Sequence, residues 1–153
     1  MSVPLKVTVG EADFDPGKEQ AELAAISSDI GAIASFTGLM RISNEGRTVR
    51  SMSLEHYPGM TQSSILRIMQ QASERWALDG AAVIHRIGEL LPGERIVWVG
   101  CASRHRGNAF QACEFIMDYL KYRAPFWKKE HTDEGDFWVD ARHSDEAAAQ
   151  RWE

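Results

Sequence analysis

The sequence predicts an α+β fold, because segments with helical periodicity alternate with pairs of short apolar segments joined by turn residues. The clearest helical signal consists of five apolar residues at the spacing of one helix face: Ile65, Ile68, Met69, Ala72 and Trp76. The clearest strand pair is 81–87 with 95–103, which we expect to form a hairpin through the Leu-Leu-Pro-Gly-Glu segment. A chain of 153 residues suits one domain with a single core, so we expect residues 1–153 to form one domain.

The N-terminal half contains three predicted strands and two predicted helices. A strand at 5–9 precedes a helix from Pro16 to about residue 26, with Asp15 as its N-cap. Strands are expected at 32–37 and 48–56, with a loop at 43–46 between them. Pro58 and Gly59 then break the chain before Thr61, the expected cap of the next helix.

The C-terminal half is predicted to hold a long helix, a strand pair and a short final helix. The long helix starts near Asn108 and stops before Pro125. Its predicted buried face consists of Phe110, Cys113, Ile116, Met117 and Leu120. Segments 126–131 and 137–142 are expected to pair across 133–136, and Ser144 to cap a helix that ends near Trp152.

Composition is typical of a globular protein, with 44% hydrophobic and 25% charged residues. The longest apolar run, 96–102, is too short to span a bilayer, and residues 1–6 lack the pattern of a signal peptide. We therefore expect a cytoplasmic protein. Cys101 and Cys113 do not form a C-x-x-C pair and lie in apolar segments, which favours two buried, reduced thiols over a disulfide or a catalytic cysteine.

The charge distribution points to a local anion site. The net charge of −5 argues against general binding of nucleic acids or anionic membranes. Residues 104–129 nevertheless carry six basic and two acidic side chains, a local charge of +4 that leaves −9 for the rest of the chain. The segment from Ser103 to Glu130 is therefore the best candidate for a working site on an anionic small molecule.

Two groups of basic residues lie at the ends of the predicted long helix. Arg104, His105 and Arg106 lie at its start, where free backbone N–H groups favour an anion, although solvated loop cations are the common alternative. Lys121 lies in the last turn, where cations often only complement the helix dipole. Its position at the edge of the apolar face predicts partial burial, which would lower the pKa of its amine and suit it to acid–base chemistry.

Further cations follow predicted strands. Arg41 comes shortly after Gly38, a glycine that indicates a backbone bend or a close approach to a ligand. Lys128 and Lys129 follow two aromatic residues that can anchor a strand, and Arg142 ends the last strand. The histidines have no metal-ligand spacing, and no Walker or G-x-G-x-x-G motif is present, so neither a metal nor a nucleotide cofactor is expected.

Five segments in one order resemble the catalytic (large) subunit of molybdopterin synthase. They are FTGLMR at 36–41, LEHYPGM at 54–60, IHRIGE at 84–89, SRHR at 103–106, and FIMDYLK at 115–121 continued by RAPFWK at 123–128. The resemblance covers about residues 30 to 143. Leu39-Met40 is more apolar than the family pattern, and Arg104 is an additional cation.

The resemblance implies a sulfurtransferase of molybdenum cofactor biosynthesis with an α/β hammerhead fold. Enzymes of this family take sulfur from the C-terminal thiocarboxylate of a small ubiquitin-like partner that ends in Gly-Gly. They convert cyclic pyranopterin monophosphate to molybdopterin without a metal. The large subunit is a homodimer within a heterotetramer, so the implied partners are the sulfur carrier and a second copy of the chain.

The resemblance also implies roles for individual residues. Lys121 corresponds to the principal acid–base group, Lys128 to electrostatic support and His105 to a proton-transferring histidine. The implied substrate contacts are Leu39, Met40, Arg41, His105, Arg106, Lys121, Lys128, Lys129, Glu130 and Arg142. Arginines can orient a phosphate ester, and a lysine ammonium can polarise the thiocarboxylate carbonyl or protonate a leaving oxygen.

The helix length bears on how one substrate meets both groups of cations. Twelve residue steps from Ala109 to Lys121 correspond to roughly 18 Å along an α-helix. His105 and Arg106 are therefore too far from Lys121 to grip one small molecule. Either the site is long, or one protomer supplies the helix start and its neighbour the lysines; the resemblance to a dimer favours a shared pocket.

Two functions of other classes compete with the enzyme. A non-catalytic module that docks a ubiquitin-like partner predicts that changes at Lys121 or Arg41 weaken binding without abolishing a reaction. A small RNA-binding domain would use Arg104, Arg106, Lys128 and Trp127, and predicts a steep salt dependence of RNA affinity. The overall acidity speaks against RNA binding.

Overall fold

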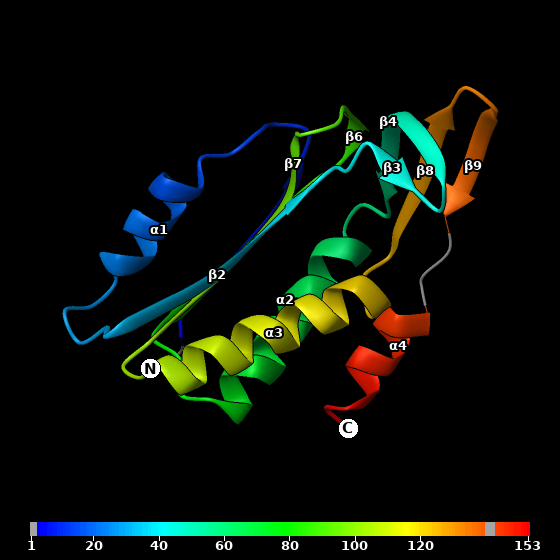
Figure 1. The fold of residues 1–153 in the computed structure, drawn as a ribbon. Helices are drawn as coiled ribbons and strands as arrows, with labels where there is room; N and C mark the ends of the chain where they lie inside the picture. Colours follow the sequence, from blue (N-terminus) through cyan, green and yellow to red (C-terminus); the bar gives the residue numbers. More distant parts are fainter. Residues whose placement is uncertain (1–2, 140–142) are drawn as a thin grey trace.

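The computed structural model describes residues 3–139 and 143–153, which form two β-sheets and four helices (Figure 1). The first sheet has the order β1 (Leu5–Gly10), β5 (Gly80–Arg86), β7 (Arg95–Ser103) and β2 (Ala32–Leu39). The second has β3 (Ser43–Asn44), β4 (Arg47–His56), β8 (Phe126–Thr132) and β9 (Gly135–Val139), with β6 (Gly88–Leu90) also on β4. The helices are α1 (Pro16–Ala24), α2 (Met60–Arg75), α3 (Arg106–Arg123) and α4 (His143–Gln150). The predicted α+β class is confirmed.

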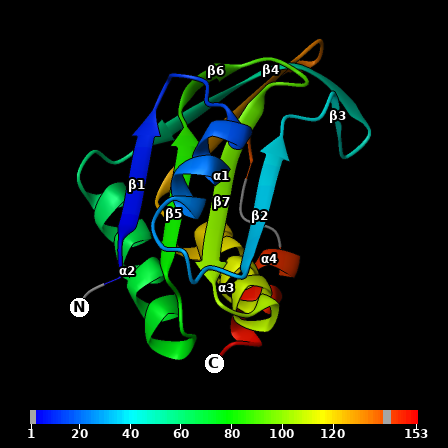
Figure 2. The same cartoon turned by 90° about the vertical axis from the view of Figure 1, so that its left-hand side faces the viewer.

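The four-stranded sheet is covered on both faces, by α1 on one and by α2 and α3 on the other (Figure 2). Alternate residues of its central strands therefore enter different cores. Val83 and Val99 pack toward α2 and α3, whereas Ile84 and Trp98 pack toward α1. This double cover explains why every residue of β5 is buried although the strand pairs are mostly antiparallel.

The expected pairing of the central strands is confirmed, but their connection is more than a turn. β5 and β7 are antiparallel neighbours, with Val83 opposite Val99. The segment between them contributes β6, which pairs with β4 and so links the first sheet to the second. In the expected loop 43–46, Ser43 and Asn44 form the short strand β3. The predicted pairing of β8 with β9 is also confirmed.

The helix starts differ from expectation at α2. Asp15 caps α1 as predicted, accepting a hydrogen bond of 2.9 Å from the Gly17 N–H. At α2, however, the N-cap is Gly59, whose φ of 83° suits glycine, so the expectation for Thr61 is wrong. The Thr61 hydroxyl instead accepts from the Tyr57 N–H at 2.9 Å and donates to the Pro125 carbonyl at 3.0 Å. It thereby ties the start of α2 to the chain just before β8.

The buried face of α3 is turned relative to the predicted one. Phe110 is 64% exposed, so its assignment to the core is wrong. The buried residues are Ala109, Ala112, Cys113, Phe115, Ile116, Met117, Tyr119 and Leu120. Helical spacing puts Phe110 on the same side as Arg106 and Glu114, both exposed, and small alanines take its place against the sheet.

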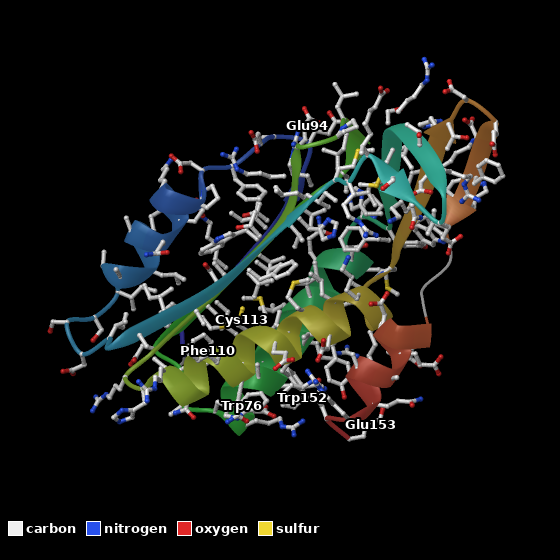
Figure 3. The ribbon with its side chains drawn as sticks, viewed as in Figure 1. Trp76, Glu94, Phe110, Cys113, Trp152 and Glu153 are labelled. Carbon is white, nitrogen blue, oxygen red and sulfur yellow. The ribbon has the colours of Figure 1, made fainter. Side chains whose placement is uncertain are left out.

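The cysteine prediction is confirmed, since Cys101 and Cys113 are free and buried. Cys113 lies between α3 and the first sheet, with its Sγ 3.8 Å from the Val99 carbonyl oxygen (Figure 3). Below α3, Trp152 packs edge-on against Trp76 with ring centroids 5.4 Å apart. The final helix begins at His143, one residue before Ser144, its expected cap. No helix in residues 3–139 and 143–153 is long and apolar enough to cross a membrane.

Candidate active site

A cavity of about 280 Å³ lies where the two sheets meet the C-terminal end of α3. Its lining combines apolar side chains with cations and carboxylates from almost every part of the fold. The lining residues are Leu39, Met40, Arg41, Ser43, Asn44, Met52, Leu54, His85, Ile96, Leu120, Lys121, Ala124, Phe126, Lys128, Glu130, Val139 and Asp145. Six of the ten predicted substrate contacts are among them: Leu39, Met40, Arg41, Lys121, Lys128 and Glu130.

Strand β8 places alternate residues in this cavity. Phe126, Lys128 and Glu130 line it. Lys129 has the opposite orientation, with its Nζ 3.8 Å from Asp136 Oδ2 and 5.3 Å from the centre of the Trp138 ring. The structure therefore separates two adjacent lysines that the sequence had grouped together.

Glu130 is held in place by polar partners from the β3–β4 hairpin. Glu130 is 4% exposed, and its carboxylate accepts two hydrogen bonds from Asn44 Nδ2, at 3.1 and 3.0 Å. Arg47 lies 3.7 Å from the same carboxylate, and its guanidinium lies 4.1 Å from the centre of the Phe137 ring. These contacts compensate the charge of Glu130, so the lining cations face a cavity that suits an anion.

Arg41 reaches the cavity because β2 is distorted at its end. The pairing of β2 with β7 shifts register between Gly38 and Leu39, which confirms the backbone bend expected from Gly38. A Cβ on Gly38 would lie 2.7 Å from Val97 Cγ1, so the Val97 side chain would have to shift to admit a larger residue there. Two hydrogen bonds then hold the chain: Met40 N–H to the Glu94 carbonyl and Gly93 N–H to the Met40 carbonyl, each 2.9 Å.

Lys121 lines the same cavity from the last turn of α3. The residue is exposed, so the partial burial predicted from its place at the edge of the apolar face is wrong. Only two residues, Ala124 and Pro125, separate α3, which ends at Arg123, from β8, which starts at Phe126. Lys121 and Lys128 are therefore carried into the cavity by one short, continuous segment.

His85 is the residue that the sequence interpretation missed. It lines the cavity from β5, is 8% exposed and stacks on Phe126, with ring centroids 3.8 Å apart and planes 18° from parallel. Burial lowers its pKa to about 4, and the charge of Lys121 acts in the same direction. Its spacing from the other histidines does not suit a metal site, and its position in the IHRIGE segment is the sequence signal that it belongs to the cavity.

His105 and Arg106 lie at the other end of α3 and do not line this cavity. Both are exposed, and the His105 side chain makes no capping hydrogen bond to the helix. The neighbouring Arg104 pairs with Asp29, its Nη2 3.5 Å from the carboxylate oxygen. Arg142 falls outside the described residues. Within the described part of the chain, no three histidine, cysteine or acidic side chains are grouped in a way that would hold a metal ion.

Comparison with known proteins assigns the family. The family model described as "MoaE protein" matches residues 9–123. The chain belongs to the MoaE family. A curated relative, the molybdopterin synthase catalytic subunit of Pseudomonas aeruginosa, is 56% identical over 149 residues, covering 97% of this chain and 99% of that protein. The Escherichia coli protein of the same name is 54% identical over 147 residues, covering 96% and 97%.

A solved structure of the family supports the fold as well. The MoaE protein of Burkholderia ambifaria superimposes with a TM-score of 0.84 at 47% identity, covering 97% of each chain. The MoaE family model ends at Arg123, before β8, but the relatives match almost the entire chain. The similarity therefore extends over α3 and over β8, the two elements that supply the cavity lysines.

Proposed function

We propose that this chain is the catalytic subunit of a molybdopterin synthase. In this role it converts cyclic pyranopterin monophosphate to molybdopterin, with sulfur from the C-terminal thiocarboxylate of a small ubiquitin-like partner. The observation that carries the proposal is the cavity in which Arg41, Lys121 and Lys128 come together, in a chain at least half identical to relatives that bear this enzyme's name.

The cavity suits both halves of the reaction. A phosphate ester needs cations that orient it and offset the charge that develops when the cyclic ester opens, and Arg41 can do this from the rim. A thiocarboxylate needs a donor that polarises its carbonyl. Lys121 acts as the principal acid–base group and Lys128 as electrostatic support, since both ammonium groups line the same space.

His105 and Arg106 belong to the substrate site of a second protomer in this proposal. Fifteen steps separate Arg106 from Lys121 on α3, which corresponds to roughly 22 Å along the helix. That span exceeds what one pterin phosphate can bridge. A homodimer that brings the start of one α3 to the end of the other would complete each pocket, with a sulfur carrier docked on each chain in a heterotetramer.

The remaining predicted contacts and the compartment are part of the same proposal. Leu39, Met40 and Glu130 line the pocket, Arg142 adds a cation, and Lys129 acts only outside the cavity described above. We place the reaction in the cytoplasm, where free thiols such as Cys101 and Cys113 are kept reduced.

The test is to mix the purified protein with thiocarboxylated carrier and cyclic pyranopterin monophosphate and to measure the dithiolene product. We expect product with the natural chain and a loss of turnover of roughly 10²-fold or more with Lys121→Ala. Near-normal turnover by Lys121→Ala would remove this lysine from its role. If the natural chain binds the carrier but forms no product, the docking-module function is correct instead.

A further inference from the structure

His85 presents an acceptor atom to the cavity. Its Nδ1 lies 2.8 Å from the Arg86 carbonyl oxygen, which can only accept, so Nδ1 carries the proton. Since burial keeps the ring neutral at physiological pH, the lone pair is on Nε2. The tautomer of His85 is thus set by the backbone of the next residue.

Nε2 has no hydrogen-bond partner among the described residues, yet it is not sealed inside the protein. Among the described side chains, in residues 3–139 and 145–153, the one fully buried nitrogen or oxygen without a partner is Arg47 Nε. Because His85 is 8% exposed and lines the cavity, its unpaired Nε2 faces that space. A buried acceptor without a partner costs free energy unless a ligand or water supplies a donor.

The surroundings of His85 suit a flat heterocycle. Phe126 stacks on the imidazole, and the cavity lining also contains the apolar residues Leu54, Ile96 and Leu120. The cations of the lining cannot accept a hydrogen bond, and the Glu130 carboxylate is already engaged by Asn44 and Arg47. Asp145 is a further carboxylate of the lining, on α4. His85 is the acceptor beside the Phe126 ring, so a flat ligand ring with N–H groups can donate to its Nε2, while the phosphate is left to the cations.

We propose that His85 is a specificity-determining residue that accepts, through Nε2, a hydrogen bond from an N–H group of the pterin ring. This inference rests on the proposed function. In it, His85 recognises the pterin ring, whereas the cations of the cavity bind the phosphate. It assigns to His85 the selection of ligands with a ring donor.

Two substitutions separate this role from a structural one. The amide nitrogen of Asn in His85→Asn falls near the position of Nδ1 and can still donate to the Arg86 carbonyl, but the side chain is too short to accept where Nε2 stood. The amide oxygen of Gln in His85→Gln reaches the position of Nε2 and restores the acceptor, at the cost of the bond to Arg86. A residue needed only for packing would tolerate the first change at least as well as the second.

The measurement is calorimetric binding of cyclic pyranopterin monophosphate to the full chain, with KM and kcat in the complete synthase reaction. We expect His85→Asn to raise the Kd and KM by roughly 10- to 100-fold with little change in kcat, because a ligand donor is left unpaired. His85→Gln should recover most of that loss. If His85→Asn does not fold, His85→Leu, which keeps the contact with Phe126, is expected to show the same rise in Kd.

The outcomes distinguish the two proposals. Natural-like affinity in His85→Asn, or equal weakening by Asn and Gln, would overturn the role of His85 and leave the proposed function intact. Absence of pterin binding and of dithiolene product with the natural chain would overturn the proposed function itself. Thermal unfolding of each variant and its affinity for the carrier serve as controls. For His85→Gln we expect natural-like affinity for the carrier and a modest loss of stability, because the bond to Arg86 is missing.

Discussion

Asn44 on β3 donates two hydrogen bonds through Nδ2 to the carboxylate of Glu130 on β8, 86 positions away in the chain. Asn44→Ala leaves this buried carboxylate short of donors and is expected to lower the free energy of unfolding by about 1–3 kcal/mol. Asn44→Asp should lower it further, because it opposes two carboxylates. Urea denaturation measures both.

A matched control for that experiment is Arg50→Ala. Arg50 pairs with Asp133 at 2.6 Å, but both side chains are more than 60% exposed. Exposed pairs contribute about 0–1 kcal/mol, so the control should change little. Equal effects of Asn44→Ala and Arg50→Ala would show that burial gives the Asn44 contact no special weight.

Adjacent lysines on β8 are expected to behave differently. Lys128→Ala removes a cation from the cavity and should lower kcat in the synthase reaction by roughly 10²-fold. Lys129→Ala removes a side chain that lies against Asp136 and Trp138 outside it, and should keep kcat within about threefold. Steady-state kinetics compare the two; a comparable loss in both would contradict the orientation of the strand.

Subunit complementation tests the shared pocket. Lys121→Ala and His105→Ala are each expected to be inactive, but a mixed dimer would contain one pocket with both natural residues. Random mixing makes half of the dimers mixed, so about a quarter of the natural activity should return. Mixed dimers are isolated with two different affinity tags. No recovery in verified mixed dimers would mean that both residues serve one chain's own site.

The pH dependence of stability should report on His85. Its pKa is about 4 in the folded chain, below the usual 6.5, because burial disfavours the charged ring. Between pH 6.5 and pH 4, the histidine therefore binds a proton in the unfolded chain but not in the folded chain. The free energy of unfolding accordingly falls as the pH drops through this range. The contribution is roughly 3 kcal/mol.

The variant His85→Leu isolates this contribution, since leucine does not titrate. The free energy of unfolding, measured at pH 7 and at pH 4.5, should fall more steeply for the natural chain than for the variant. The charge of Lys121 acts on this histidine, and Glu130 and Asp145 line the same cavity; all three are present in both proteins, so the comparison isolates the contribution of His85. Parallel curves would show that His85 titrates normally.

Periodicity predicted the elements that carry the site better than it predicted their details. The stripe of α2 from Ile65 to Ala72 is buried as expected, because a helix on a sheet must bury one face. The predicted burial of Phe110 was wrong, because hydrophobicity alone does not reveal how far a helix is rotated about its axis. Small alanines allow α3 to approach the sheet closely. The prediction of Thr61 as the N-cap of α2 was wrong because a glycine at positive φ, Gly59, ends the turn one residue before the helix.

The site itself was only partly predictable from local sequence. The charge of the segment 104–129 pointed to α3 and β8, and the resemblance supplied the individual lysines. To place Lys128 and Lys129 on opposite sides, one must know which face of β8 lines the cavity. That orientation depends on the pairing of β8 with β4 and β9. His85 was hidden because its role arises from contacts with Phe126, 41 positions later, and such long-range stacking leaves no local pattern.

The alternation of side chains along β8 also limits how the segment from Pro125 to Glu130 can change in length. Because side chains alternate along a strand, inserting or deleting one residue between Pro125 and Glu130 would turn Trp127 and Lys129 toward the cavity and Lys128 away from it. A change of two residues would keep the faces and only shift them along the strand. Odd length changes there should therefore be far more harmful than even ones, whatever the identity of the inserted residue.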